Sequence, residues 1–141
     1  MIYLDTNVIV YAIENHPKFG EACKRILLDI EKGNLKALSS VMTLAELISV
    51  LVKINRMRKS ENKSTVDINM NVSAVLSLPV TWIEMDFSVI EKASRYTYKT
   101  SGSDYIHAAS MDIHGVYSII SADAELDKID FAKRIDPLEY H

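Results

Sequence analysis

The 141 residues of this chain are enough for one domain with a substantial core and too few for two ordinary domains. With 48% hydrophobic and 25% charged residues, the composition excludes disordered and fibrous proteins. The formal net charge of −3 excludes binding of nucleic acid through bulk positive charge, so a polyanion would have to be met by a local patch.

Short apolar runs alternate with helical patterns along the chain. The predicted strands, in chain order, are residues 2–4, 36–40, 79–85, 116–120 and 132–135. The first predicted helix begins near residue 8, and the others cover residues 17–33, 43–54, 66–78, 88–99 and 104–115, with a short helical turn at 124–129.

This alternation of strand and helix predicts parallel β-α-β units with right-handed crossovers. No internal repeat or linker divides the chain, so we expect one domain over residues 1–141. The expected fold class is α/β, with a central parallel sheet covered by helices on both faces. In such sheets the carboxyl ends of the strands and the first turns of the next helices share one edge, where ligands bind.

No predicted helix is suited to crossing a membrane. The longest apolar stretch, residues 41–52, contains Glu46 and is shorter than the ~20 residues that a membrane-spanning helix needs. No basic region precedes the first apolar run, which argues against a signal peptide. The single cysteine, Cys23, is interpreted as a packed thiol and has no assigned role. We therefore expect a cytoplasmic protein without a membrane partner.

Four acidic residues fall at the expected sheet edge. Asp5 and Asp123 follow predicted strands, whereas Glu46 and Asp104 lie in the first turns of predicted helices. Each has a simple structural explanation, because Asp caps helices, acids in a first turn interact well with the helix dipole, and Thr43 with Glu46 matches a capping box. Taken singly, capping is the simpler interpretation of each acid.

Taken together, the acids favour a metal site. Carboxylates held within ~4 to 6 Å of one another repel unless a cation is present. Oxygen ligands suit Mg²⁺ or Mn²⁺, and no set of histidines or cysteines has the spacing of a zinc site. Such a pocket can activate water and stabilise the leaving oxygen in phosphodiester cleavage.

Other chemistries lack their motifs. Neither G-x-G-x-x-G nor G-x-x-x-x-G-K-[ST] occurs, so dinucleotide binding and P-loop chemistry are not indicated. A phosphatase with an aspartyl nucleophile would be expected to have a second acid where this chain has Asn7, two residues after Asp5. His107 lies three residues after Asp104 on the same helix face, and we interpret it as a packed or hydrogen-bonded residue rather than a base.

Residues 53–63 form the one basic stretch, with a single acid, Glu61. It is equally well interpreted as the solvated end of a helix or as an arm that contacts RNA phosphates. The candidate RNA contacts are Lys53, Arg56, Arg58, Lys59 and Lys63.

Four stretches, in this order, resemble the PIN-domain family of ribonucleases, and within it the VapC-like toxins of toxin-antitoxin pairs. They are "YLDTNVIVY", "SSVMTLAEL", "SDYIHAAS" and "IISADAELD", and the resemblance covers nearly the whole chain. It implies a three-layer α/β/α sandwich with a parallel sheet of about five strands, in agreement with the alternating pattern above.

The resemblance also implies roles for individual residues. The catalytic and metal-binding acids would be Asp5, Glu46, Asp104 and Asp123, with Mg²⁺ or Mn²⁺ as cofactor. The polar supports would be Thr6, Asn7 and Ser121. Asp127 matches an additional metal-binding acid of many members, although a surface acid on a short helix is an equally good interpretation.

The expected function is therefore a metal-dependent endoribonuclease that acts as the toxin of a type II toxin-antitoxin pair. The expected partners are an RNA substrate, a small antitoxin protein and a second copy of the chain in a homodimer. One alternative is a PIN nuclease for RNA maturation or decay without an antitoxin. Another is a non-catalytic receiver-like domain. Such a domain requires two acids directly after the first strand, and "LDTN" contains one.

Overall fold

The computed structural model describes all 141 residues. The elements in chain order are β1 (Ile2–Leu4), α1 (Thr6–Ile13), α2 (Gly20–Glu31), β2 (Ala37–Ser40), α3 (Val41–Ser60), α4 (Ile68–Leu76), β3 (Val80–Ile83), α5 (Phe87–Ala93), α6 (Gly102–Ile113), β4 (Ser118–Ile120), the 3₁₀ helix η1 (Ala124–Lys128), β5 (Lys133–Ile135) and the 3₁₀ helix η2 (Pro137–Glu139). None of the helices is long and apolar enough to cross a membrane.

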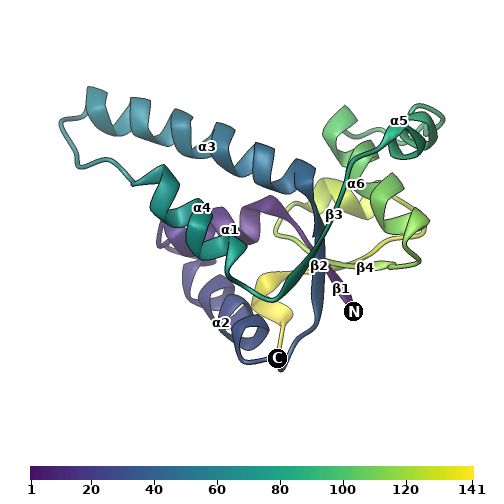
Figure 1. The fold of residues 1–141 in the computed structure, drawn as a ribbon, viewed down its shortest axis with the longest axis horizontal. Helices are drawn as coiled ribbons and strands as arrows, with labels where there is room; N and C mark the ends of the chain where they lie inside the picture. Colours follow the sequence, from purple (N-terminus) through teal and green to yellow (C-terminus); the bar gives the residue numbers. More distant parts are fainter.

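The strands form one parallel sheet of five strands in the order β3-β2-β1-β4-β5, which confirms the predicted fold class (Figure 1). The central strand β1 pairs with β2 on one side and with β4 on the other. Because the chain winds outward from β1 through β2 and β3, and then continues on the other side with β4 and β5, the strand order reverses between β1 and β4. Parallel sheets bind ligands at this point, beyond the carboxyl ends of the strands.

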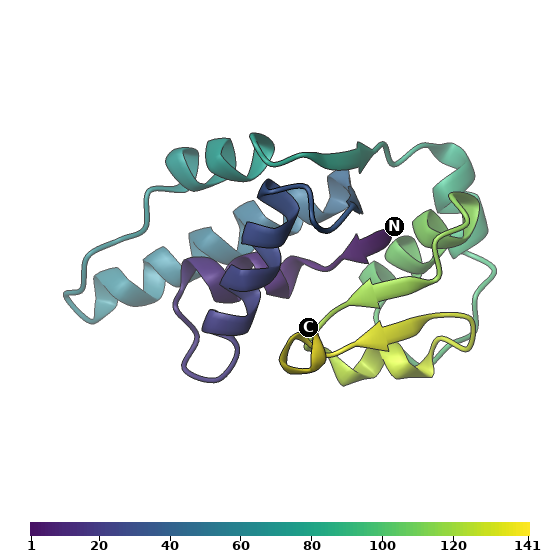
Figure 2. The ribbon, with the colours of Figure 1, turned by 90° about the horizontal axis from the view of Figure 1, so that it is seen from below.

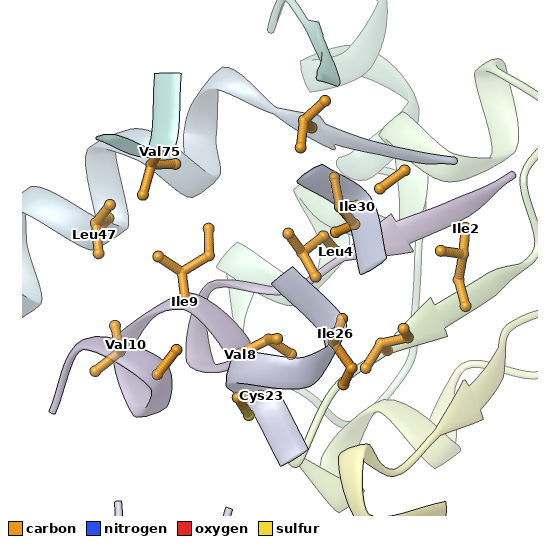
Figure 3. Close-up of a cluster of buried hydrophobic side chains, with 14 of the residues drawn as sticks. Ile2, Leu4, Val8, Ile9, Val10, Cys23, Ile26, Ile30, Leu47 and Val75 are labelled. Atoms are coloured by element: carbon orange, nitrogen blue, oxygen red, sulfur yellow. The ribbon is translucent and has the colours of Figure 1, made fainter. Parts of the chain in front are cut away.

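Both faces of the sheet are covered, as the short apolar strands require. On one face Leu4 and Ile120 join a cluster that includes Val8, Ile26 and Leu47, contributed by α1, α2 and α3 (Figure 3). On the other face the alternate strand residues, including Tyr3, Leu38 and Ile119, pack against Met111 of α6 and Leu126 of η1. The three-layer α/β/α sandwich is therefore built from the strict alternation of side chains along each strand.

Helix α3 extends well beyond the sheet. Figures 1 and 2 show its first turns beside the strands and its last turns away from them, with the chain returning along α4. The side chain of Asn55 fixes this return, because it both donates to the carbonyl of Val66, at 2.9 Å, and accepts from its N–H, at 2.8 Å. The basic stretch thus lies at the end of a helical arm.

Several predicted helix ends were wrong, and local hydrogen bonds explain why. Helix α3 begins at Val41 because Ser40 is its N-cap and accepts from the N–H of Met42 at 3.0 Å. The predicted capping box of Thr43 and Glu46 is therefore absent, and Thr43 is instead buried. The same helix continues through the basic stretch to Ser60 rather than ending near residue 54.

Three other boundaries also differ from the prediction. Helix α1 begins at residue 6 instead of residue 8, since Asp5 caps it. Helix α2 begins at Gly20, three residues after the expected start at Pro17. Helix α5 ends at Ala93, well before residue 99. Since helix ends depend on single capping bonds, the apolar periodicity of a segment does not locate them.

Candidate active site

The four acids predicted to share one edge line a single cavity of about 360 Å³, together with seven other residues. The acids are Asp5, Glu46, Asp104 and Asp123. Asp5 follows β1, Glu46 lies in the second turn of α3, Asp104 lies in the first turn of α6, and Asp123 lies between β4 and η1. The remaining lining residues are Thr6, Asn7, Val10, Tyr11, Val50, Ser101 and Ser103.

Asp5 is held by three donors at the point where the strand order reverses. Its Oδ1 accepts from the backbone N–H of Thr6 at 2.7 Å, so it caps α1. Its Oδ2 accepts from the hydroxyl of Ser121 at 2.6 Å and from the amide of Asn7 at 3.2 Å. Burial raises the pKa of Asp5, while the charge of His107 and the bond from Ser121 act in the opposite direction. The carboxylate of Asp5 thus caps α1 and also lines the cavity.

Asn7 and Ser121 connect the end of β4 to the start of α1. The amide of Asn7 donates to the hydroxyl of Ser121 at 3.0 Å and accepts from the N–H of Ala122 at 3.1 Å. Ser121 in turn accepts from the N–H of Asp123 at 3.0 Å. Asp123 then caps η1 by accepting from the N–H of Glu125 at 3.0 Å. These bonds fix Asp123 relative to Asp5 across 118 residues of sequence.

Glu46 receives donors from three side chains. Its Oε1 accepts from the hydroxyl of Thr6 at 3.0 Å and lies 2.5 Å from Nε2 of His107. Its Oε2 accepts from the hydroxyl of Ser103 at 2.6 Å. Partial burial raises the pKa of Glu46, but the bonds from His107, Ser103 and Thr6 together with the His107 charge outweigh it and lower the pKa overall. Glu46 is therefore an ionised acceptor and has no capping role.

Asp104 lies in the first turn of α6 without capping it, because Ser101 is the N-cap and accepts from the N–H of Asp104 at 3.3 Å. Burial raises the pKa of Asp104, and the negative charges of Asp123 and Asp5 raise it further. The cavity therefore concentrates negative charge, as the sequence argument requires.

The cavity suits a hydrated divalent cation. No three histidine, cysteine, aspartate or glutamate side chains lie close enough together to form a closed metal cage. Mg²⁺ keeps several waters and is usually bound by only one or two carboxylates, so such a cage is not required. The donors in this cavity are carboxylate, hydroxyl and amide oxygens, which Mg²⁺ and Mn²⁺ prefer. The residues present thus fit one of these ions with part of its water shell.

Asp127, the additional acid, does not line the cavity. Its two carboxylate oxygens accept from Nε and Nη2 of Arg134, at 2.9 and 3.2 Å. This bidentate pair lowers the pKa of Asp127 and gives the carboxylate a partner on β5. The structure therefore offers no geometric support for Asp127 as a metal ligand.

The basic stretch divides into paired and free side chains. Arg58 donates to Glu14 at 3.0 Å, and Lys63 forms an ion pair with Glu61 at 2.9 Å. Within residues 53–63, the exposed basic residues without a salt bridge to an acid are Lys53, Arg56 and Lys59. Only these three are positioned to meet an external phosphate without breaking an existing ion pair.

Sequence reasoning did not single out Ser103 or Tyr11, which also line the cavity. Ser103 directly precedes Asp104, so the polar run "SGSD" at a helix start was a usable signal. Tyr11 is four residues after Asn7 and therefore on the same face of α1, a spacing that becomes informative once Asn7 is known to line the cavity.

Comparison with known proteins identifies the family. A family model described as PIN domain matches residues 2–132. Among solved structures, a toxin from Mycobacterium tuberculosis described as a VapC that cleaves the sarcin-ricin loop aligns with a TM-score of 0.72 and 18% identity, over 94% of this chain and 97% of that one.

Other solved structures give the same fold. The VapBC complex of Rickettsia felis, described as bound to a DNA fragment from its promoter, aligns with a TM-score of 0.67 and 19% identity, over 96% of this chain and 98% of that one. A VapBC structure from nontypeable Haemophilus influenzae aligns with a TM-score of 0.64 and 19% identity, over 98% and 99% of the two chains. A search of curated protein sequences finds no match.

Proposed function

Because this chain belongs to the PIN domain family, we propose that it is a metal-dependent endoribonuclease that serves as the toxin of a type II toxin-antitoxin pair. The observation that carries the proposal is the cavity, in which acids from four separate elements converge. Helix caps alone would give no reason for these acids to converge, and neither Glu46 nor Asp104 is a cap.

The chemistry follows from the donor set. Asp5 and Asp123 would hold Mg²⁺ or Mn²⁺ most directly, and Asp104 and Glu46 would complete its shell. The bound ion would supply water activation and charge stabilisation for phosphodiester hydrolysis. The protein contributes by holding Asp5 through Thr6, Asn7 and Ser121, so that this carboxylate cannot turn away from the cavity. Glu46 presents a fixed oxygen that can accept a proton or orient a water. Attack by an activated water needs no covalent intermediate with the protein.

The partners are proposed on the same basis. Toxin-antitoxin complexes recur among the similar structures, including one from Klebsiella pneumoniae described in those words. We infer a small antitoxin protein as partner, RNA as substrate, and a homodimer as the assembled toxin. A reading frame for a short DNA-binding protein beside the gene would favour the toxin over a nuclease of general RNA maturation.

The proposal is tested with purified protein and an end-labelled single-stranded RNA. The wild type is expected to cut this RNA in Mn²⁺ or Mg²⁺ and not in chelator, and Asp5→Asn is expected to remove nearly all cleavage. Asp67→Asn is the matched control, because Asp67 also caps a helix, accepting from the N–H of Met70 at 2.9 Å, but lies outside the cavity. Cleavage by Asp5→Asn at the wild-type rate would overturn the site assignment.

The toxin role needs a test in cells. Expression of the wild type is expected to arrest growth, and co-expression of the neighbouring short protein is expected to restore it. Asp5→Asn should cause no arrest. Wild-type cleavage in vitro without growth arrest would support a nuclease of RNA maturation instead.

A further inference from the structure

A chain of buried polar side chains runs from the centre of the sheet to the cavity. Tyr3 lies on the central strand β1 and has no solvent exposure. Its hydroxyl is 2.6 Å from Nδ1 of His107, and Nε2 of the same imidazole is 2.5 Å from Oε1 of Glu46. His107 is only 3% exposed, whereas Glu46 is 28% exposed and lines the cavity. The three residues thus connect the buried core to the candidate active site.

The direction of these hydrogen bonds follows from the chemistry of the groups. An ionised carboxylate only accepts, so Nε2 of His107 must donate to Glu46. Both the neutral ring with its proton on Nε2 and the fully protonated ring satisfy this requirement. In either state the hydroxyl of Tyr3 is the partner of Nδ1, and it fixes the plane of the ring. The orientation of His107 is thus set from the core side.

The orientation of Glu46 is set in turn. A carboxylate has roughly four acceptor positions, two on each oxygen. Both positions on Oε1 are used, by Thr6 and His107, and Ser103 uses one on Oε2. One position on Oε2 therefore remains for a water or a cation in the cavity. Without His107, Oε1 would lose one of its two donors, and the carboxylate would be held only by the hydroxyls of Thr6 and Ser103.

We propose that Tyr3 and His107 are positioning residues that hold Glu46 so that one acceptor position of its Oε2 faces the cation site. The proposal deepens the proposed function and rests on it, since it concerns the same cavity. The alternative is that the pair only packs the core. A purely structural pair would affect folding stability and leave the affinity for a cation unchanged.

The test is calorimetric titration of the folded protein with Mn²⁺ in the absence of RNA. Tyr3→Phe removes only the hydroxyl and does not touch Glu46. His107→Leu removes the donor to Glu46, whereas His107→Gln keeps an amide donor close to the position of Nε2. Residues that orient metal ligands typically contribute about 10- to 100-fold in affinity. We expect the dissociation constant to rise about 10-fold in His107→Leu, by a smaller factor in Tyr3→Phe, and to return toward the wild-type value in His107→Gln.

Ser110→Ala is the matched control. Ser110 is fully buried on α6, the helix that carries His107, and its hydroxyl donates to the carbonyl of Ile106 rather than to Tyr3, His107 or Glu46. The Ser110→Ala variant should be less stable than the wild type and bind Mn²⁺ with the same affinity. Coupling is tested with the Tyr3→Phe change in the His107→Leu background, where it should have no further effect. Wild-type affinity in both Tyr3→Phe and His107→Leu, measured well below their melting temperatures, would overturn the proposal. If His107→Leu does not fold, Tyr3→Phe decides the question alone, and wild-type Mn²⁺ affinity in that variant would overturn the proposal.

The experiments distinguish failure of the positioning proposal from failure of the proposed nuclease function. If the wild type cuts RNA and the variants bind Mn²⁺ like the wild type, the positioning role is wrong and the nuclease stands. If the wild type binds Mn²⁺ and the variants bind it more weakly, but no RNA is cut, the positioning role stands and the nuclease is wrong. A wild type that binds no Mn²⁺ contradicts both.

Discussion

Replacing Asp104 with asparagine should stabilise the protein in chelator and reduce its gain from Mn²⁺. The change keeps the size of the side chain and removes one negative charge. It also loses no helix cap, because Ser101 caps α6. The pKa of Asp104 is raised by burial and by the charges of Asp123 and Asp5. The ionised carboxylate therefore destabilises the metal-free fold, and the neutral amide does not.

The size of the effect can be bounded. Two unit charges about 5 Å apart repel by roughly 3 kcal/mol at an effective dielectric constant of about 20. Asp104 is partly exposed, and solvent screens this repulsion, so we expect the free energy of unfolding to rise by about 1 kcal/mol. For a chain of this size that corresponds to roughly 2–4 °C in the melting temperature.

Mn²⁺ should reverse the order of stability. At a hundred times its dissociation constant, a ligand that binds only the folded state stabilises by about 2.7 kcal/mol. A variant with tenfold weaker affinity gains about 1.4 kcal/mol at the same concentration. The difference exceeds the advantage of about 1 kcal/mol that the variant has in chelator.

Thermal melts of the wild type and Asp104→Asn, in chelator and again in millimolar Mn²⁺, measure both effects. Glu21→Gln is the control for the helix dipole, because Glu21 is an exposed acid in the first turn of α2 and lies outside the cavity. It should show neither effect. The reasoning is refuted if Asp104→Asn is less stable than the wild type in chelator and gains as much as the wild type from Mn²⁺.

Three further predictions concern the pH dependence of stability, the basic stretch and Asp127. The stability advantage of Asp104→Asn in chelator should be absent below the pKa of an unfolded aspartate and should grow as the pH rises through the raised pKa of folded Asp104, as melts across pH will show. Neutralising the exposed Arg56 and Lys59 should weaken RNA binding. The slope of the logarithm of the binding constant against the logarithm of salt concentration should become shallower by about 0.7 per lost phosphate contact, and an unchanged slope would show that these side chains make no phosphate contact. Asp127→Asn should leave Mn²⁺ affinity unchanged in calorimetry, because Asp127 is already paired with Arg134, and a tenfold loss would restore it as a ligand.

The sequence was sufficient for the fold class and for the convergence of the acids. The apolar residues of β1 and β4 located these two strands, and the polar residues that follow each strand located the edge where Asp5 and Asp123 lie. These features are local in sequence, and the rules for parallel sheets convert them into a shared edge. The recognition of the PIN family from four short stretches is confirmed by the family match.

Contacts between distant residues could not be predicted. His107 was interpreted as packed or hydrogen-bonded, but its partner Glu46 is 61 residues away and lies on another helix. Asp127 was a candidate ligand because nothing in the sequence shows that β5 places Arg134 against it. The assumed capping box at Thr43 failed because Ser40 offers an earlier cap. In each case the outcome depends on a partner that only the folded chain supplies.

The central claim is that the acids of the cavity form one cation site. The most direct measurement is the anomalous scattering of Mn²⁺ in a crystal of the protein soaked in that ion. We expect a peak inside the cavity that lies within ligand distance of at least two of the four acids and is lost in Asp5→Asn crystals. A soaked crystal with no peak in the cavity, or with a peak that persists unchanged in Asp5→Asn, would contradict the claim.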